Sequence, residues 1–70
     1  MKKTTLGSRL LKLRTDAELT QQQLADKVGK TRQRVLQLED PANEDIRLPL
    51  ARKMAKALGV PLSALVADVA

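Results

Sequence analysis

The chain has 70 residues, which suffices for one small domain and lies near the lower size at which an apolar core folds without disulfides or metals. It contains no cysteine and no histidine, which excludes a disulfide framework, a thiolate or imidazole zinc site and the commonest general base. Thirteen basic residues against eight acidic residues give a formal net charge of +5, which favours a polyanionic partner, with nucleic acid ahead of a membrane surface. The simpler alternative is that the charge serves solubility alone.

Aromatic residues are also absent, so the expected core consists of aliphatic side chains, which suit packed helices better than a sheet. Their absence argues against binding single-stranded nucleic acid by base stacking. No apolar run approaches the ~20 residues of a membrane span, and Met1-Lys2-Lys3 is not followed by an apolar signal core. We therefore expect a cytoplasmic, nucleoid-associated protein without a membrane segment, and a single domain at residues 6–70.

A first helix is predicted from about Leu6 to Ala17, after a flexible basic arm at residues 1–5. Thr4 or Thr5 can cap its N-terminus. The apolar residues that recur on one face of this helix are Leu6, Leu10, Leu13 and Ala17.

Two short helices with a glycine between them are predicted next. The first spans Gln21–Val28, begins with a capping-box sequence after Thr20, and ends at Gly29, a residue type that adopts a left-handed C-terminal conformation at little cost. The second runs from about Arg32 to Leu38 or Glu39 and is capped by Thr31. Two helices joined by a short turn that contains glycine form a helix-turn-helix. The side chains expected to hold this pair together are Leu24, Ala25, Val28, Val35 and Leu38.

An acidic loop, residues 40–45, separates this pair from a fourth helix. The fourth helix begins near Leu48, because Pro49 is tolerated only in a first turn, and it ends at Gly59. Its expected buried face consists of Leu48, Ala51, Ala55 and Leu58, with Met54 beside them.

Val60-Pro61 opens a fifth predicted helix with an apolar stripe. We assign Leu62 and Leu65 of this stripe to the core. Val66 and Val69 are weaker candidates for self-association.

The outer face of the third helix carries side chains that can contact DNA bases. At about 100° per residue, Arg32, Gln33 and Gln37 lie opposite the apolar anchors, and Leu36 lies among them. Arginine can donate two hydrogen bonds to guanine, glutamine can pair with adenine, and a leucine can contact the thymine methyl group. We predict that the base contacts in a major groove are made by Arg32, Gln33, Gln37 and Leu36.

Contacts to the DNA backbone are predicted for Gln21, Thr31 and Arg34, which stand at the helix starts or beside the base-contacting arc. A helix rich in glutamine and arginine is more often only a solvated surface. The conjunction of paired caps, Gly29 and the small Ala25 at the helix crossing favours DNA binding here.

A family resemblance covers nearly the whole chain. It is carried, in this order, by Leu10, Arg14, Leu19-Thr20-Gln21, Leu24-Ala25, Val28-Gly29, Val35, Leu38-Glu39 and Ala55-Lys56-Ala57-Leu58-Gly59-Val60. With these residues, Leu6 to about Val66 resembles the phage repressor and Cro-like (XRE-type) helix-turn-helix family. The resemblance implies a compact all-α, five-helix, lambda-repressor-like domain that binds an operator as a dimer. It also implies a structural salt bridge between Arg14 and Glu39.

The chain departs from the family at several positions. Lys30 replaces a residue that is often small, which adds a candidate phosphate contact, and Leu36 occupies a usually polar position. The loop is acidic where several relatives are basic, so Arg47 is its best candidate for a backbone contact. Lys53 and Lys56 are expected to be solvated charges.

The leading hypothesis is a sequence-specific regulator of transcription, a repressor, that reads a palindromic operator in double-stranded DNA as a homodimer. The alternative is an antitoxin-type module that binds a toxin-like protein and its own promoter, which the short chain and the apolar C-terminal stripe indicate. An enzyme is not expected, since histidine and cysteine are absent and there is little room for a pocket. We therefore expect no catalytic residue, no metal and no cofactor.

Overall fold

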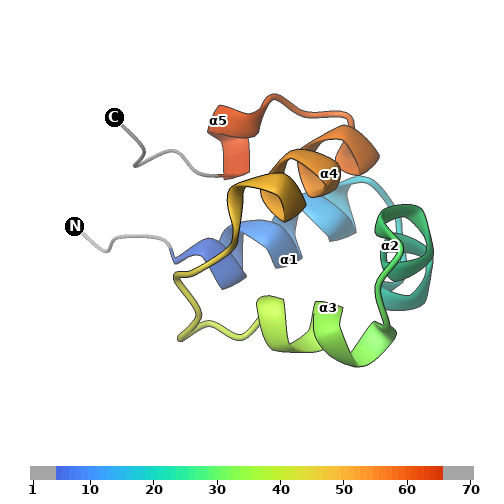
Figure 1. The fold of residues 1–70 in the computed structure, drawn as a ribbon, viewed down its shortest axis with the longest axis horizontal. Coiled ribbons are helices and arrows are strands. Elements are labelled where there is room, and N and C mark those ends of the chain that lie inside the picture. Colours follow the sequence, from blue (N-terminus) through green and yellow to red (C-terminus); the bar gives the residue numbers. More distant parts are fainter. Residues whose placement is uncertain (1–4, 66–70) are drawn as a thin grey trace.

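The computed structural model describes residues 5–65, and that part of the chain contains helices and no strand. Figure 1 shows α3 along one side of the domain, α1 between it and the α4–α5 pair, and α2 closing one end. The five helices are α1 (Leu6–Asp16), α2 (Gln21–Val28), α3 (Arg32–Leu38), α4 (Leu48–Leu58) and α5 (Leu62–Leu65). The predicted all-α class and the predicted helix-turn-helix at α2 and α3 are confirmed.

Threonine hydroxyls cap the first three helices, as the sequence predicts. The capping box at α2 is complete, because the Thr20 amide also donates to Gln23 Oε1 at 2.8 Å. Such caps typically contribute ~1 kcal/mol each, since they satisfy amides that the helix leaves without partners. The cap bonds run to Thr5 from the amide of Ser8 (3.2 Å), to Thr20 from that of Gln23 (3.0 Å) and to Thr31 from that of Arg34 (3.1 Å).

The turn between α2 and α3 depends on Gly29. Its φ of 69° lies in the left-handed region, where a β-carbon is strained. The amide of Lys30 then donates to the carbonyl of Ala25 at 2.9 Å, which closes the end of α2 and turns the chain toward Thr31. Glycine at this position therefore sets the angle at which α3 leaves α2.

The core confirms the predicted anchors of the helix pair. Leu24, Ala25 and Val28 of α2 are buried, as are Val35 and Leu38 of α3. Dense packing of these side chains against α1 and α4 fixes the inner side of α3 and leaves its outer side in solvent. The largest side chains with no exposed surface are Leu10, Leu24, Val35, Met54 and Leu65.

Two predicted core positions are wrong. Leu48 is 48% exposed, and Leu50 is buried in its place. The buried arc of α4 is centred on Met54 and Leu58, and Leu50 precedes Met54 by one helical turn, whereas Leu48 lies at the edge of the arc in the first turn. Ala17 is exposed because α1 ends one residue before it and Ala17 serves as the C-cap.

The described part of the chain begins at Thr5 and ends at Leu65. Of the arm expected at residues 1–5, only Thr5 is described, as the N-cap of α1. Val66 and Val69 lie outside the described residues. Leu65 has no exposed surface, as predicted, and its carbonyl accepts a hydrogen bond from Arg9 Nη1 at 3.4 Å, which ties α5 to α1. Leu62, also assigned to the core, packs against it while partly buried.

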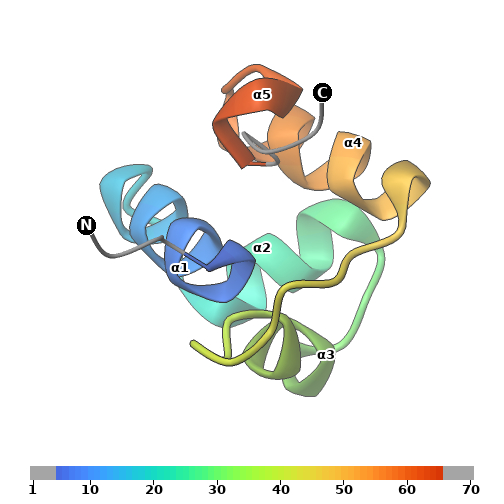
Figure 2. The ribbon, with the colours of Figure 1, turned by 90° about the vertical axis from the view of Figure 1, so that its left-hand side faces the viewer.

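The loop between α3 and α4 packs directly on the first turn of α1, which the sequence-based interpretation missed. The amide of Gly7 donates to the carbonyl of Asn43 at 3.0 Å. A β-carbon added at Gly7 would lie 1.8 Å from the carbonyl oxygen of Asp40, so only glycine fits without displacement of the loop. Figure 2 shows this loop passing beside α1 on its way to α4. Within residues 5–65 no helix is long and apolar enough to cross a membrane.

Candidate nucleic-acid interface

Figure 2 shows α3 at the margin of the molecule. The side chains on its outer side are mostly polar and are exposed. We call the exposed side chains of Arg32, Gln33, Leu36 and Gln37 the recognition face. Leu36 is 52% exposed although it is apolar, whereas Val35 beside it in the sequence has no exposed surface. The structure thus brings together the four residues for which base contacts are predicted, on a helix whose opposite side is fully packed.

A buried ion pair holds the end of α3 against the rest of the domain. Arg14 Nε lies 2.5 Å from Glu39 Oε2, and Arg14 Nη2 donates to Glu39 Oε1 at 3.2 Å. The two side chains are 12% and 3% exposed, and Arg14 Nη1 also donates to the carbonyl of Leu19 at 2.7 Å. The salt bridge that the family resemblance implies is present, in two-pronged geometry.

Gln21 joins the same cluster. Its side-chain amide donates to Glu39 Oε1 at 3.2 Å, so this group is engaged inside the protein. The sequence-based interpretation assigned Gln21 to the DNA backbone and missed this hydrogen bond, because the two residues stand 18 positions apart and no local pattern links them. The amide N–H of Gln21, in the first turn of α2, remains directed out of the helix end.

A shallow hollow lies between the start of α2 and the start of α3. It places Arg32 of the recognition face close to the first residues of α2. Arg32, predicted to contact a base, and Gln21 of α2, predicted to contact the DNA backbone, therefore line the same hollow. The residues that line this hollow are Arg14, Glu18, Leu19, Thr20, Gln21, Gln22 and Arg32.

A basic hollow lies on the other side of α3, where the turn before α3 meets the start of α4. It gathers three of the residues predicted to contact phosphate, namely Lys30, Arg34 and Arg47. Lys53, which the sequence predicts to be a solvated charge, is exposed and also lines this hollow; which residues of α3 and α4 face one hollow is not a local property of the sequence. Pro49 and Leu50 complete the lining. This basic hollow and the hollow at the start of α2 both border the recognition face, and a further hollow is lined by its residues Leu36 and Gln37.

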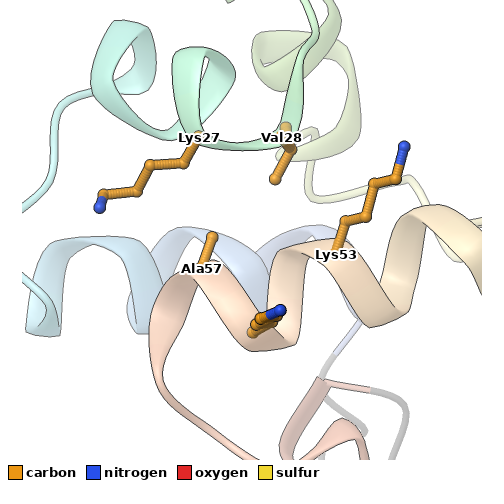
Figure 3. Close-up of a pocket in the computed structure, with 5 residues that line it drawn as sticks. Lys27, Val28, Lys53 and Ala57 are labelled. Carbon is orange, nitrogen blue, oxygen red and sulfur yellow. The ribbon is translucent and has the colours of Figure 1, made fainter.

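A second basic hollow lies between α2 and α4 (Figure 3). Lys27 projects from α2 and Lys53 from α4, and Val28 and Ala57 lie between the two helices. Lys56 is the third lysine of the lining, and no carboxylate lines it. Three lysines and no carboxylate line this hollow, so its surface favours anions. Lys53 belongs to both basic hollows.

The acidic loop is held by Asn43. Its side-chain amide donates to the carbonyl of Leu38 at 3.0 Å, and its side-chain oxygen accepts the amide of Asp45 at 3.2 Å. The side chains of Glu44 and Asp45 in this loop are exposed. Within residues 5–65, no three or more potential metal-binding side chains lie together in a cluster. Asn43 is a residue that the sequence-based interpretation did not single out, although an asparagine shortly after a proline is typical of such turns.

Comparison with known proteins agrees with this arrangement. A helix-turn-helix family model matches residues 10–65. The restriction-modification controller protein C.AhdI from Aeromonas hydrophila is similar, with a TM-score of 0.78 and 33% identity over 86% of each chain. The clp gene regulator ClgR from C. glutamicum has a TM-score of 0.79 at 22% identity, covering 90% of this chain and 80% of that one. Fe(II) HppE in complex with substrate shares the fold at 23% identity, but this chain covers only 36% of it.

No curated protein sequence matches the chain significantly. The fold and the exposed face of α3 define a helix-turn-helix DNA-binding regulator. The chain belongs to the phage repressor and Cro-like (XRE-type) helix-turn-helix family.

Proposed function

We propose that the protein is a sequence-specific repressor that acts in the cytoplasm and binds a palindromic operator as a homodimer, with α3 in the major groove. The observation that carries this proposal is the division of α3 into two sides. Val35 and Leu38 anchor it with at most 3% exposure, and every residue of the recognition face is exposed. A helix presented in this way fits a groove about 12 Å wide, and repression requires only that the bound protein occupies the DNA.

The recognition face supplies the base contacts. The guanidinium of Arg32 matches the two acceptors of guanine, and the amides of Gln33 and Gln37 match the donor and acceptor of adenine. Leu36 has no polar group to offer, so it contributes an apolar contact with a thymine methyl group. Arg32 and Gln33 stand in the first turn of α3, which in this docking geometry lies nearest the bases.

The hollow at the start of α2 and the basic hollow beside the start of α4 supply contacts to the two phosphate backbones that border the major groove. On one side, Gln21 contacts phosphate through its backbone amide at the start of α2, since its side chain is bonded to Glu39. On the other side, Lys30, Arg34 and Arg47 contact the opposite strand. The Thr31 hydroxyl accepts the amide of Arg34, which leaves its own proton to donate to a phosphate oxygen.

Selection of bound duplexes from a random library tests the proposal. We expect enrichment of a sequence with two-fold symmetry, whose half-sites lie about one helical turn apart. The selected duplex should bind at least ~10³-fold more tightly than a scrambled duplex at the same salt concentration. Equal affinity for the two duplexes would exclude sequence-specific regulation.

The 33% identity to a restriction-modification controller supports a second, more specific role, the control of restriction-modification genes. A methyltransferase gene and an endonuclease gene next to the coding sequence, with the selected operator upstream of them, are the expected observations. The antitoxin alternative predicts instead a neighbouring toxin gene and co-purification of one small protein with the chain. Genes of neither kind nearby would leave the repressor proposal without these two refinements.

A further inference from the structure

A hollow beside the C-terminal half of α3 holds two exposed leucines. It lies between α1 and α3, which are neighbours in the fold (Figure 2). Leu11 of α1 is 40% exposed and Leu36 of α3 is 52% exposed, and the exposed Pro41 lines the hollow with them. We call this site the leucine hollow. Single exposed leucines are common on protein surfaces, but two that share one hollow with a proline form an apolar patch that a ligand can cover.

The leucine hollow is continuous with the recognition face, because Leu36 and Gln37 belong to both. A base edge that contacts Leu36 in a major groove therefore also faces the apolar wall formed by Leu11 and Pro41. The apolar group that a base presents in the major groove is the methyl group at C5 of a pyrimidine. A pyrimidine methyl group is therefore the occupant that matches the apolar part of the hollow.

A carboxylate of the same hollow can accept a hydrogen bond from a base. Asp40 lines the hollow and is exposed, and its Oδ1 accepts the amide of Ala42 at 2.8 Å, which holds the side chain at the start of the loop. A carboxylate can accept several hydrogen bonds, so acceptor positions remain. The other carboxylate of the lining, Glu39, is 3% exposed and is bonded to Arg14 and Gln21. Asp40 is thus the acceptor that the hollow offers to DNA.

The leucines and the carboxylate together distinguish three pyrimidines. Cytosine presents an amino donor at C4, whereas thymine presents an acceptor, O4, and a methyl group at C5. Thymine therefore covers the leucines but turns its O4 acceptor toward Asp40. Cytosine offers its amino group to Asp40 but leaves Leu11 and Leu36 in water. Of the three, 5-methylcytosine alone satisfies both parts of the hollow, since it carries the methyl group and the amino donor.

We propose that the leucine hollow recognises 5-methylcytosine in double-stranded DNA, so that occupancy of the operator responds to cytosine methylation. The inference rests on the proposed binding of an operator by α3. It refines the methyl contact of Leu36 by naming the methylated base that the hollow favours. The acidic loop also acquires a role, because an acceptor without a donor opposite it costs affinity. Asp40 therefore selects against thymine at this position.

Duplexes that differ by a single methyl group test the methyl contact. At each position of the selected half-site in turn, cytosine is compared with 5-methylcytosine opposite guanine, and uracil with thymine opposite adenine. At one position of the half-site, we expect each added methyl group to raise the affinity about fourfold, as burial of one such group does.

Substitution of the leucines shows whether the protein or the DNA causes this gain. Leu11→Ala and Leu36→Ala should each reduce the gain, because each removes part of the apolar wall. The control is Leu48→Ala, which removes a 48% exposed leucine outside the hollow and should leave the gain intact. A gain that both hollow variants retain in full would come from the shape of methylated DNA and would overturn the inference.

Asp40→Asn tests the choice between the two methylated pyrimidines. The asparagine keeps an acceptor oxygen for the amide of Ala42, and its amino group can donate to O4 of thymine. The preference for 5-methylcytosine over thymine should therefore fall about three- to tenfold. Asp45→Asn is the control, since it removes the same charge from an exposed loop residue outside the hollow. Equal effects of the two substitutions would contradict a hydrogen bond from the base to Asp40.

Two parallel selections separate this inference from the proposed function. One random library contains cytosine, and the other contains 5-methylcytosine throughout. A specific operator from either library supports the proposed function. If methylation of cytosine raises the affinity at no position of that operator, only the inference about the leucine hollow fails. If neither library yields a duplex that binds more tightly than a scrambled one, both fail.

Discussion

Glu39 accepts hydrogen bonds from Arg14 of α1 and Gln21 of α2, although it stands at the C-cap of α3. A carboxylate that is 3% exposed is buried at a tolerable cost only because these donors replace water. The cluster therefore fixes the end of α3 relative to the two preceding helices.

Arg14→Ala should destabilise the fold by about 3–5 kcal/mol, because it leaves the Glu39 carboxylate buried without its cation. Urea denaturation followed by circular dichroism measures this change. The control is Lys12→Ala, which removes an ion pair with Asp16 whose side chains are 77% and 63% exposed. It should cost no more than ~0.5 kcal/mol. Equal effects of the two substitutions would show that the buried pair has no special role.

Substitutions on the two sides of α3 should separate stability from specificity. Gln33→Ala removes an exposed side chain, so thermal stability should stay nearly constant while the preferred base at one operator position changes. Val35→Ala removes two buried methyl groups and should lower the free energy of unfolding by about 2 kcal/mol. Unfolding curves and binding to a set of single-base operator variants provide the two measurements. A Gln33→Ala protein with an unchanged base profile would contradict the assignment of the recognition face.

At the scale of helices and loops, the close approach of residue 40 to Gly7 limits the first turn of α1. Gly7→Ala would normally favour a helix by up to ~1 kcal/mol. Here the added β-carbon meets the carbonyl oxygen of Asp40 at 1.8 Å, so the loop must move and Asn43 loses its place. We expect net destabilisation of about 1–3 kcal/mol in chemical denaturation.

Gly29→Ala provides the comparison for Gly7→Ala. The backbone of residue 29 has a φ of 69°, which is strained for alanine, and no atom lies within 4 Å of the added β-carbon. We expect Gly29→Ala to lower the free energy of unfolding by about 1–2 kcal/mol. The loop between α3 and α4 should be unaffected, so the nuclear magnetic resonance chemical shifts of Asn43 should not change. An unperturbed loop in Gly7→Ala would show that the two segments are not in contact.

The helices were predictable from sequence because the signals that define them are local. Each threonine cap lies three residues from its partner amide, and Gly29 and Gly59 mark helix ends within a single turn. The features that were missed depend on which distant segments meet. Gly7 with Asn43 is one such feature and Gln21 with Glu39 is another, since periodicity along one helix carries no information on the loop that packs against it. Leu48 and Leu50 both stand in the first turn of α4, and the packing of α4 on distant segments decides that Leu50 is buried and Leu48 is exposed.

At the scale of the whole molecule, we expect the placement of basic residues to govern the affinity for DNA. Lys30, Arg34 and Arg47 line one hollow beside α3, whereas Lys12 lies on α1 next to Asp16. If the hollow holds DNA phosphates, each substitution Lys30→Gln or Arg47→Gln should reduce the slope of log affinity against log salt concentration by about 0.9. Lys12→Gln removes the same charge and should leave the slope unchanged. A fluorescence titration across several salt concentrations provides the measurement, and equal slopes for all variants would contradict the phosphate assignment.

The anchors of α3, Val35, Leu38 and the cap Glu39, all lie on its inner side, and none belongs to the recognition face. Changes at Arg32, Gln33, Leu36 and Gln37 therefore need no adjustment of the core. If the recognition face reads DNA as proposed, the outer half of this helix can be exchanged as a unit, and the domain is then a scaffold for retargeting. On the same proposal, operator and regulator could diverge together by single steps in evolution, because an intermediate with an altered DNA preference would still fold.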